Sequence, residues 1–208
     1  MISFEQYLVL VRQQLYPSLR DEGFSGSGQT LRRRQADVIH IFNIQGSSGA
    51  DRCYVNLGVH LSFLPTEGGG RCEPPKLKEY ECAFRTRLKV PPQYSFGWPY
   101  GASADEAHQS IEALRAAWLG QGLPLLRRFS VFPADFLSIP ASAFRDSAHA
   151  TPFAGLGPSA LTFARMALHV SDIPLAKEYA AAGLAIAPDG ASSLRAQYHR
   201  ILALANAT

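Results

Sequence analysis

The stretch that decides the fold is Cys53-Tyr54-Val55-Asn56-Leu57-Gly58-Val59-His60-Leu61-Ser62-Phe63. Apolar side chains occupy every second position, and mainly polar residues stand between them. Successive side chains of a β-strand point to opposite faces of the sheet, so this alternation predicts a strand with one face in a core and one polar face. Such a strand is typical of an antiparallel sheet that is covered on one side.

The segments on either side of this stretch predict further strands. Residues 38–45 are rich in β-branched and aromatic side chains, and a Gly/Ser turn at residues 46–51 separates them from the first stretch. Shorter strands are expected at residues 30–34 and 81–88. Neighbouring strands joined by short turns run antiparallel, so we expect a meander of about four strands.

Helical patterns precede and follow the predicted sheet. Ser3 and Gln6 form a capping box that opens an amphipathic helix over residues 4–22, which Pro17 should kink. A second capping box at Ser103 opens another helix. Alanine-rich helices are expected near residues 158–170, 173–187 and 191–205.

Together these elements predict the α+β class. The expected order is an N-terminal helix, an antiparallel sheet, flanking helices and then an all-helical C-terminal tail. We expect residues 1–132 to form the sheet domain and residues 133–208 to form a helical extension packed on it, in one structural unit.

The composition is that of an ordinary globular protein, with 47% hydrophobic and 18% charged residues. A net charge of +3 lacks the dense basic stripe of a nucleic-acid binder, so nucleic acid is not the expected partner. The first residues do not form a signal peptide, and no apolar run reaches the ~18 residues needed to cross a membrane. Three cysteines without a C-x-x-C pair are typical of reduced thiols. We therefore expect a cytoplasmic protein of bacterial type.

Several short runs give the chain a family resemblance. They are Gly23-Phe24, Leu31-Arg32-Arg33-Arg34, Val38-Ile39-His40-Ile41-Phe42-Asn43-Ile44-Gln45, Tyr54-Val55-Asn56-Leu57-Gly58-Val59 and Cys82-Ala83-Phe84-Arg85-Thr86-Arg87-Leu88. With Trp98 in the aromatic loop that follows, they make residues 2–130 resemble a bacterial family known as domain of unknown function 4304. The resemblance implies an α+β domain that opens with a helix. It implies no reaction and no partner.

The C-terminal tail is similar to a single tetratricopeptide helical hairpin. Small residues and a proline fall at the positions of that repeat, namely Ala164, Ala176, Ala180, Gly183 and Pro188. Ala160 and Ala167 depart from it, since large residues are usual there. About three repeats are needed for an independent solenoid, so close Ala/Gly helix packing against the sheet domain is the alternative.

The common signatures of catalysis are absent from the sequence. There is no G-x-S-x-G, no P-loop and no dinucleotide fingerprint. Zinc is not favoured, because the cysteines lack paired spacing and Cys53 falls on the apolar side of its strand. Cys72 beside Arg71 is the one candidate nucleophile, but a Gly-rich loop positions it poorly. We predict no catalytic residue, no metal and no cofactor.

The polar side of the sheet and an aromatic loop are the candidate binding surface. Asn56 and His60 point the same way along one strand, and polar side chains of the neighbouring strands can join them. Paired arginines beside amides suit a carboxylate or a phosphate, although a solvated sheet face gives the same pattern. The candidate binding residues are Asn43, Gln45, Asn56, His60, Arg85, Arg87, Trp98 and Tyr100.

Two functions follow from this surface. The first is a non-enzymatic protein-binding module, with an immunity-type antagonist of a toxin as one form, since aromatic residues and arginine are enriched at interfaces. Its aromatic surface would be Tyr94, Phe96, Trp98 and Tyr100. The alternative is a small-molecule or anion-binding enzyme in which His60 transfers protons beside the amides and arginines.

Overall fold

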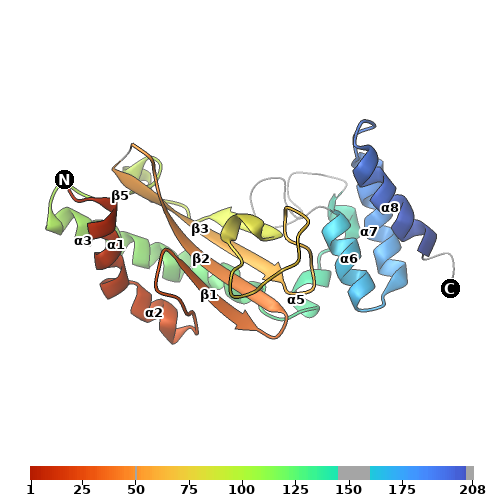
Figure 1. Ribbon diagram of the computed structural model, residues 1–208, viewed down its shortest axis with the longest axis horizontal. Coiled ribbons are helices and arrows are strands. Elements are labelled where there is room, and N and C mark those ends of the chain that lie inside the picture. The colour runs from red at the N-terminus through yellow and green to blue at the C-terminus, as the bar shows by residue number, and fades with distance from the viewer. Residues whose placement is uncertain (50, 145–159, 205–208) are drawn as a thin grey trace.

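The computed structural model describes residues 1–49, 51–144 and 160–204 and has the predicted α+β architecture (Figure 1). The antiparallel sheet has the order β1-β2-β3-β4, and the short strand β5 pairs with the far end of β3. The strands are β1 (Thr30–Gln35), β2 (Val38–Gly46), β3 (Arg52–Leu61), β4 (Phe84–Arg87) and β5 (Trp98–Pro99). The predicted meander is confirmed, and β5 is an addition to it.

Strand β4 is shorter than the predicted strand 81–88. Residues Glu79–Glu81 instead form a turn of 3₁₀-helix, η1, and the strand begins only after Cys82 and Ala83. In the register of the sheet, Asn43 lies opposite Asn56, and Asn56 lies opposite Arg87. The polar positions of three strands therefore stand in one row across the sheet.

The N-terminal helix is divided in two, as Pro17 predicts. Helix α1 (Phe4–Gln14) has the capping box between Ser3 and Gln6, and helix α2 (Tyr16–Asp21) carries the proline in its first turn. A proline is tolerated there because the N–H groups of a first turn have no partner within the helix.

A second helical segment packs, like α1 and α2, on the face of the sheet that carries Val55, Leu57 and Val59. Helix α3 (Ala104–Ala117) passes behind the strands in Figure 1 and continues through a π-helical turn (Trp118–Gly122) into α4 (Leu123–Arg128). The Trp118 ring packs edge-on against Phe24 and Phe42, with centroids 5.8 and 5.4 Å away. At Gly122 a Cβ atom would lie 2.8 Å from the Trp118 ring, so only glycine fits there without a shift.

The opposite face of the sheet is half covered by residues 62–83, which lie in front of the strands in Figure 1. Under this segment lies a small second core of Ile39, Ile41, Cys72, Leu77 and Cys82. The Arg32 side chain holds the segment in place, since its Nε donates to the carbonyl of Leu77 at 2.7 Å. The polar face predicted from the alternation is therefore buried over Ile39 and Ile41 and is open at the end of the sheet near β5.

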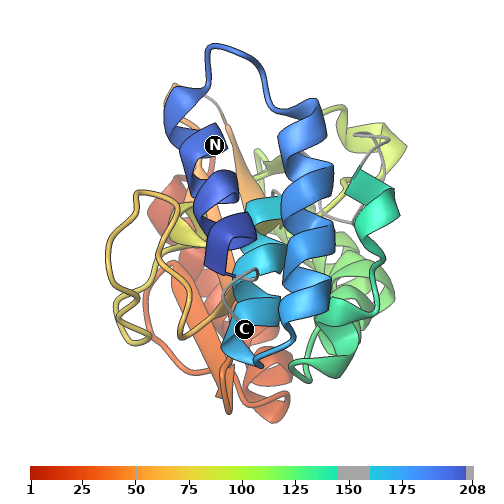
Figure 2. The same cartoon turned by 90° about the vertical axis from the view of Figure 1, so that its right-hand side faces the viewer.

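The C-terminal helices lie beyond one end of the sheet (Figures 1 and 2). They are α6 (Ala160–His169), α7 (Ile173–Ile186) and α8 (Ser192–Leu204), preceded by the short helix α5 (Ala134–Leu137). They share the main core with the sheet: Phe163 packs edge-on against Phe84, and His169 stacks on Phe63 at 3.6 Å. Within the described ranges, no helix has the length and apolar character to cross a membrane. The division at residue 132 and the tetratricopeptide likeness stay predictions.

Candidate functional site

The open end of the sheet carries a continuous row of polar side chains, which we call the amide ladder: Thr30, Asn43, Gln45, Asn56 and Arg87. Asn56 is its centre, because its Nδ2 donates to the side-chain oxygens of Asn43 at 3.2 Å and Gln45 at 3.1 Å. The Asn43 Nδ2 donates in turn to Thr30 Oγ1 at 2.9 Å. The ladder thus crosses the sheet from β1 to β4 and brings together four of the eight predicted residues.

Arg87 ends the ladder and is held from two directions. Its Nε donates to Asn56 Oδ1 at 3.1 Å, and its guanidinium carbon lies 4.4 Å from the centre of the Tyr54 ring. Stacking on an aromatic ring orients the planar guanidinium and leaves its outer N–H groups directed to solvent. Tyr54 was not among the predicted binding residues, although it lies on the same face of β3 as Asn56.

The arrangement suits recognition of oxygen acceptors. Asn56 is buried, whereas Gln45 and Arg87 are exposed, so the donors that remain for a ligand belong to these outer members. A fixed guanidinium beside an amide binds carboxylates with defined geometry. The ladder therefore offers a pre-organised polar surface that lies on strands and not on mobile loops.

His60 lies on the same strand but does not join the ladder. Its Nδ1 accepts the backbone N–H of Ala83 at 3.0 Å, and its Nε2 lies 3.3 Å from the carbonyl of Leu64, so both nitrogens serve to hold residues 62–83. Burial lowers its pKa, which keeps the ring neutral. Four residues along a strand also place it about 13 Å from Asn56. The prediction that His60 lies with the amides is therefore wrong. Both of its ring nitrogens contact the segment 62–83, which covers this end of the face.

Arg85 also lies apart from the ladder. It stands opposite Gly58, and its Nη1 donates to the backbone carbonyl of Tyr80 at 3.1 Å. Glu79 lies near both Arg85 and Arg87; burial raises its pKa, and the two guanidinium charges oppose that rise. Among the described residues, the histidine, asparagine and arginines expected around an enzyme site do not converge: Arg87 bonds Asn56, whereas His60 and Arg85 bond backbone groups of the segment 62–83.

The aromatic loop is mostly packed, as expected for at least part of so aromatic a segment, and this removes Trp98 and Tyr100 from the candidate binding surface. Trp98 is fully buried edge-on beside Tyr94, and Tyr100 is buried with its hydroxyl donating to the carbonyl of Arg52 at 2.6 Å. Both belong to the main core because β5 pairs with β3 and draws the loop inward. Phe96 is the exception: it is 68% exposed, and Arg52 lies over its ring.

The three cysteines are buried on two different faces of the sheet. Cys53 belongs to the main core, and Cys72 and Cys82 belong to the small second core. Burial raises the pKa of Cys72, which is the opposite of what an activated nucleophile needs. Among the residues that the structure describes, no group of three potential metal-ligating side chains is present.

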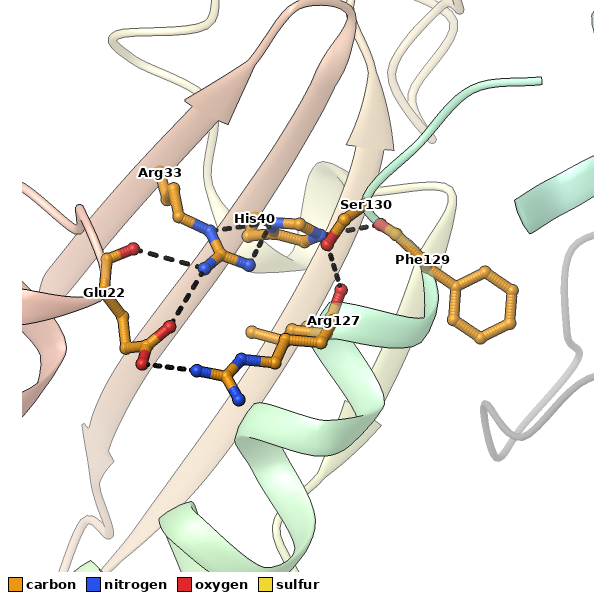
Figure 3. Close-up of polar contacts among 7 residues, drawn as sticks. Glu22, Arg33, His40, Arg127, Phe129 and Ser130 are labelled. Atoms are coloured by element: carbon orange, nitrogen blue, oxygen red, sulfur yellow. Dashed lines mark hydrogen bonds and ion pairs between the residues drawn. The ribbon is translucent and has the colours of Figure 1, made fainter. Parts of the chain in front are cut away.

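A second polar cluster, unpredicted from the sequence, lies on the helix-covered face (Figure 3). His40 is fully buried there, and its Nδ1 lies 3.2 Å from Nε and 3.0 Å from Nη2 of the Arg33 guanidinium. The other ring nitrogen, Nε2, lies 2.7 Å from the carbonyl of Phe129. Arginine has only donors, so Nδ1 must accept and Nε2–H must donate to the carbonyl. His40 is therefore held as one neutral tautomer.

Charge and burial together keep this histidine neutral. Burial lowers the pKa of His40 to about 4; the hydrogen bond to Phe129 opposes the shift, and the charge of Arg33 adds to it. Arg33 is neutralised from the other side, because Glu22 lies 3.6 Å from its Nη1 and also accepts from Arg127 at 2.7 Å. The cluster joins α2, β1, β2 and the end of α4. Arg33 and His40 are buried within it and Arg127 stays exposed, so the buried pair acts as a structural tie.

A signal for this pair was present in the sequence. Successive side chains of a strand point to opposite faces, so Arg33 must lie on the other face from Arg32 and Arg34, and in β1 it is buried while Arg34 is exposed. The two-residue turn between β1 and β2 places Arg33 directly opposite His40. A basic residue facing a histidine on the apolar side of a hairpin indicates a buried pair.

Comparison with known proteins agrees with the resemblance seen in the sequence. The searches of curated proteins and of solved structures found no match. A family model does match, over residues 15–128, which is more than half of the chain and contains the whole amide ladder and the Arg33–His40 pair. The chain belongs to the family described as domain of unknown function DUF4304.

Proposed function

We propose that this chain is a protein-binding module whose contact surface is the open end of the polar sheet face. The observation that carries the proposal is the position of Arg87, fixed between Asn56 and Tyr54 on strands and facing outward. Arginine and tyrosine are enriched among the residues that dominate binding energies at protein interfaces. An arginine that is ordered before binding loses less conformational entropy when a partner arrives.

The polarity of this surface favours a partner with acidic groups. The amide ladder presents amide and guanidinium groups, which pair with carboxylates. The exposed Phe96, with Arg52 over its ring, adds an aromatic contact on the loop that leads into β5. An immunity-type antagonist, which neutralises a toxic protein by covering a functional surface, is the form of module that we propose.

Site-specific cross-linking tests the proposal. A photoreactive amino acid is placed at Gln45, on the polar face, and in a second variant at Val9, which is exposed on α1. In cells of the native host, we expect one defined cross-linked protein from position 45 and not from position 9. Replacing Arg87 with alanine should then weaken binding of that purified protein by about tenfold or more, as for an interface hot spot. Equal labelling from both positions, or none from position 45, would refute the proposal.

A further inference from the structure

Strand β4 is the outer strand of the sheet. The order β1-β2-β3-β4 leaves it with β3 on one side, and within the described residues no strand pairs with its other side. The outer strand of a sheet presents a row of N–H and C=O groups to which another chain can pair. In β4 only alternate residues can present such groups outward.

The register of β4 against β3 shows which residues these are. The N–H of Leu88 donates to the carbonyl of Val55 at 2.9 Å, and this pair continues the register in which Thr86 lies opposite Leu57. In an antiparallel ladder the residues that exchange hydrogen bonds alternate with residues whose groups point away. The backbone N–H and C=O groups of Arg85 and Arg87 therefore point outward. Across the described ranges, no residue pairs with these outward groups.

The two sides of this edge differ in chemistry. Arg85 and Arg87 stand two positions apart in β4, about 7 Å along the strand, and Lys89 follows just beyond the end of the strand, so three cations lie along this edge. Glu79 supplies one opposing charge beside the two arginines, so three cations against this carboxylate leave the edge positive. Charged side chains on an edge strand can serve only to prevent aggregation, and that role does not require them to be held in one position. Arg87 is held in one position by Asn56 and Tyr54, which favours a binding role.

On the helix-covered side, the same edge borders a hollow of about 260 Å³. Its lining includes Thr86, Leu88, Gln121 and Leu125, together with Arg87 and Lys89, so it runs from β4 to the π-helical turn and the first turn of α4. The volume suits one aliphatic side chain. A strand added beside β4 would direct alternate side chains toward the cations and toward this hollow.

We propose that β4 binds an extended acidic segment of a partner protein as an additional strand of the sheet. Backbone hydrogen bonds to Arg85 and Arg87 hold the segment, acidic side chains at alternate positions pair with the three cations, and an apolar side chain between them enters the hollow beside Thr86. The inference rests on the proposed function, because it gives the class of partner for the same end of the polar face.

A synthetic peptide of nine residues with alternating glutamate and valine tests the inference on the full chain. We expect saturable binding, with the backbone amide resonances of Arg85 and Arg87 among those that shift most. A peptide with N-methyl groups on the amides that face β4 should lose at least about tenfold in affinity, because it cannot pair with the outward carbonyls. A peptide with lysine in place of glutamate should bind at least about tenfold more weakly. Equal binding of either control would overturn the inference.

A charge-reversed protein supplies an independent test. The double variant Arg85→Glu/Arg87→Glu should prefer the lysine peptide, whereas Arg12→Glu/Arg200→Glu, which changes the net charge equally at exposed sites on α1 and α8, should keep the glutamate preference. Unchanged preference in the first variant would overturn the inference; if it fails to fold, the N-methyl comparison on the native chain still decides. The outcomes separate the two proposals: peptide binding without cross-linking at Gln45 rejects the proposed function alone, and cross-linking without peptide binding rejects strand addition alone.

Discussion

Lowering the pH from 7 to 4 should destabilise this protein through the buried His40. The buried ring has a pKa of about 4, against an ordinary value of 6.5. Between these values the unfolded chain binds a proton that the folded chain does not, so the free energy of unfolding falls as the pH falls. Each pKa unit corresponds to about 1.36 kcal/mol, so complete passage through this window removes about 3 kcal/mol from the stability.

The surroundings of His40 in the folded protein disfavour its protonated form. Protonation would place a hydrogen on Nδ1, where two donors of Arg33 already point, and would add a charge to a site with no water contact. Burial also lowers the pKa of His60, so the whole protein should lose more than His40 alone accounts for. The contribution of His40 must therefore be isolated by substitution.

Urea unfolding of the native protein and of His40→Gln at several pH values between 7 and 4 is the assay. Glutamine can accept from Arg33 and donate to Phe129 but does not titrate, so the stability of the variant should fall by about 3 kcal/mol less over this range. His199→Gln, at an exposed position of α8, should keep the native pH dependence. Parallel pH profiles for the native protein and His40→Gln would refute the reasoning.

Three further predictions test the packing. Replacing Asn56 with alanine should cost about 1–3 kcal/mol of stability by urea unfolding, because its partners lose their hydrogen bonds, whereas Gln45→Ala at the exposed end should cost less than about 0.5 kcal/mol. Gly183→Ala should cost about 1–3 kcal/mol of stability, because the added methyl group would overlap the ring of Tyr198 in α8. Gly190→Ala has open space around it and should be near neutral. Similar melting temperatures for the two variants would contradict this. A thiol reagent should modify Cys72 before the other two cysteines, because it keeps 7% of its surface exposed and they keep none.

The sequence predicted those parts of the fold that depend on local pattern. The alternation in β3 gave its two faces correctly, and the capping box and Pro17 gave the start and the division of the N-terminal helix. Four members of the amide ladder were predicted because period-two spacing places them on one face. All of these residues lie in strands, where alternate side chains share one face whatever packs around them.

The remaining site residues depended on long-range packing, which spacing does not encode. Nothing in the strand pattern of His60 shows that residues 62–83 fold back over it, and the loop around Trp98 gave no sign that β5 pairs with β3. The partner of His40 at Phe129 lies 89 positions away in the chain. These contacts follow from which surfaces meet, and only the assembled sheet and helices determine that.

The tie between His40 and Phe129 bears on how the chain should be divided for experiments. An expression fragment cut to the family match at residues 15–128 would omit the Phe129 carbonyl and all of α1, including the buried Tyr7 that bonds Ser110. Such a fragment would retain every strand yet expose an orphaned imidazole and an uncovered flank of the sheet. A fragment that keeps this tie must begin before Ser3 and extend past Phe136, whose ring packs against Phe129.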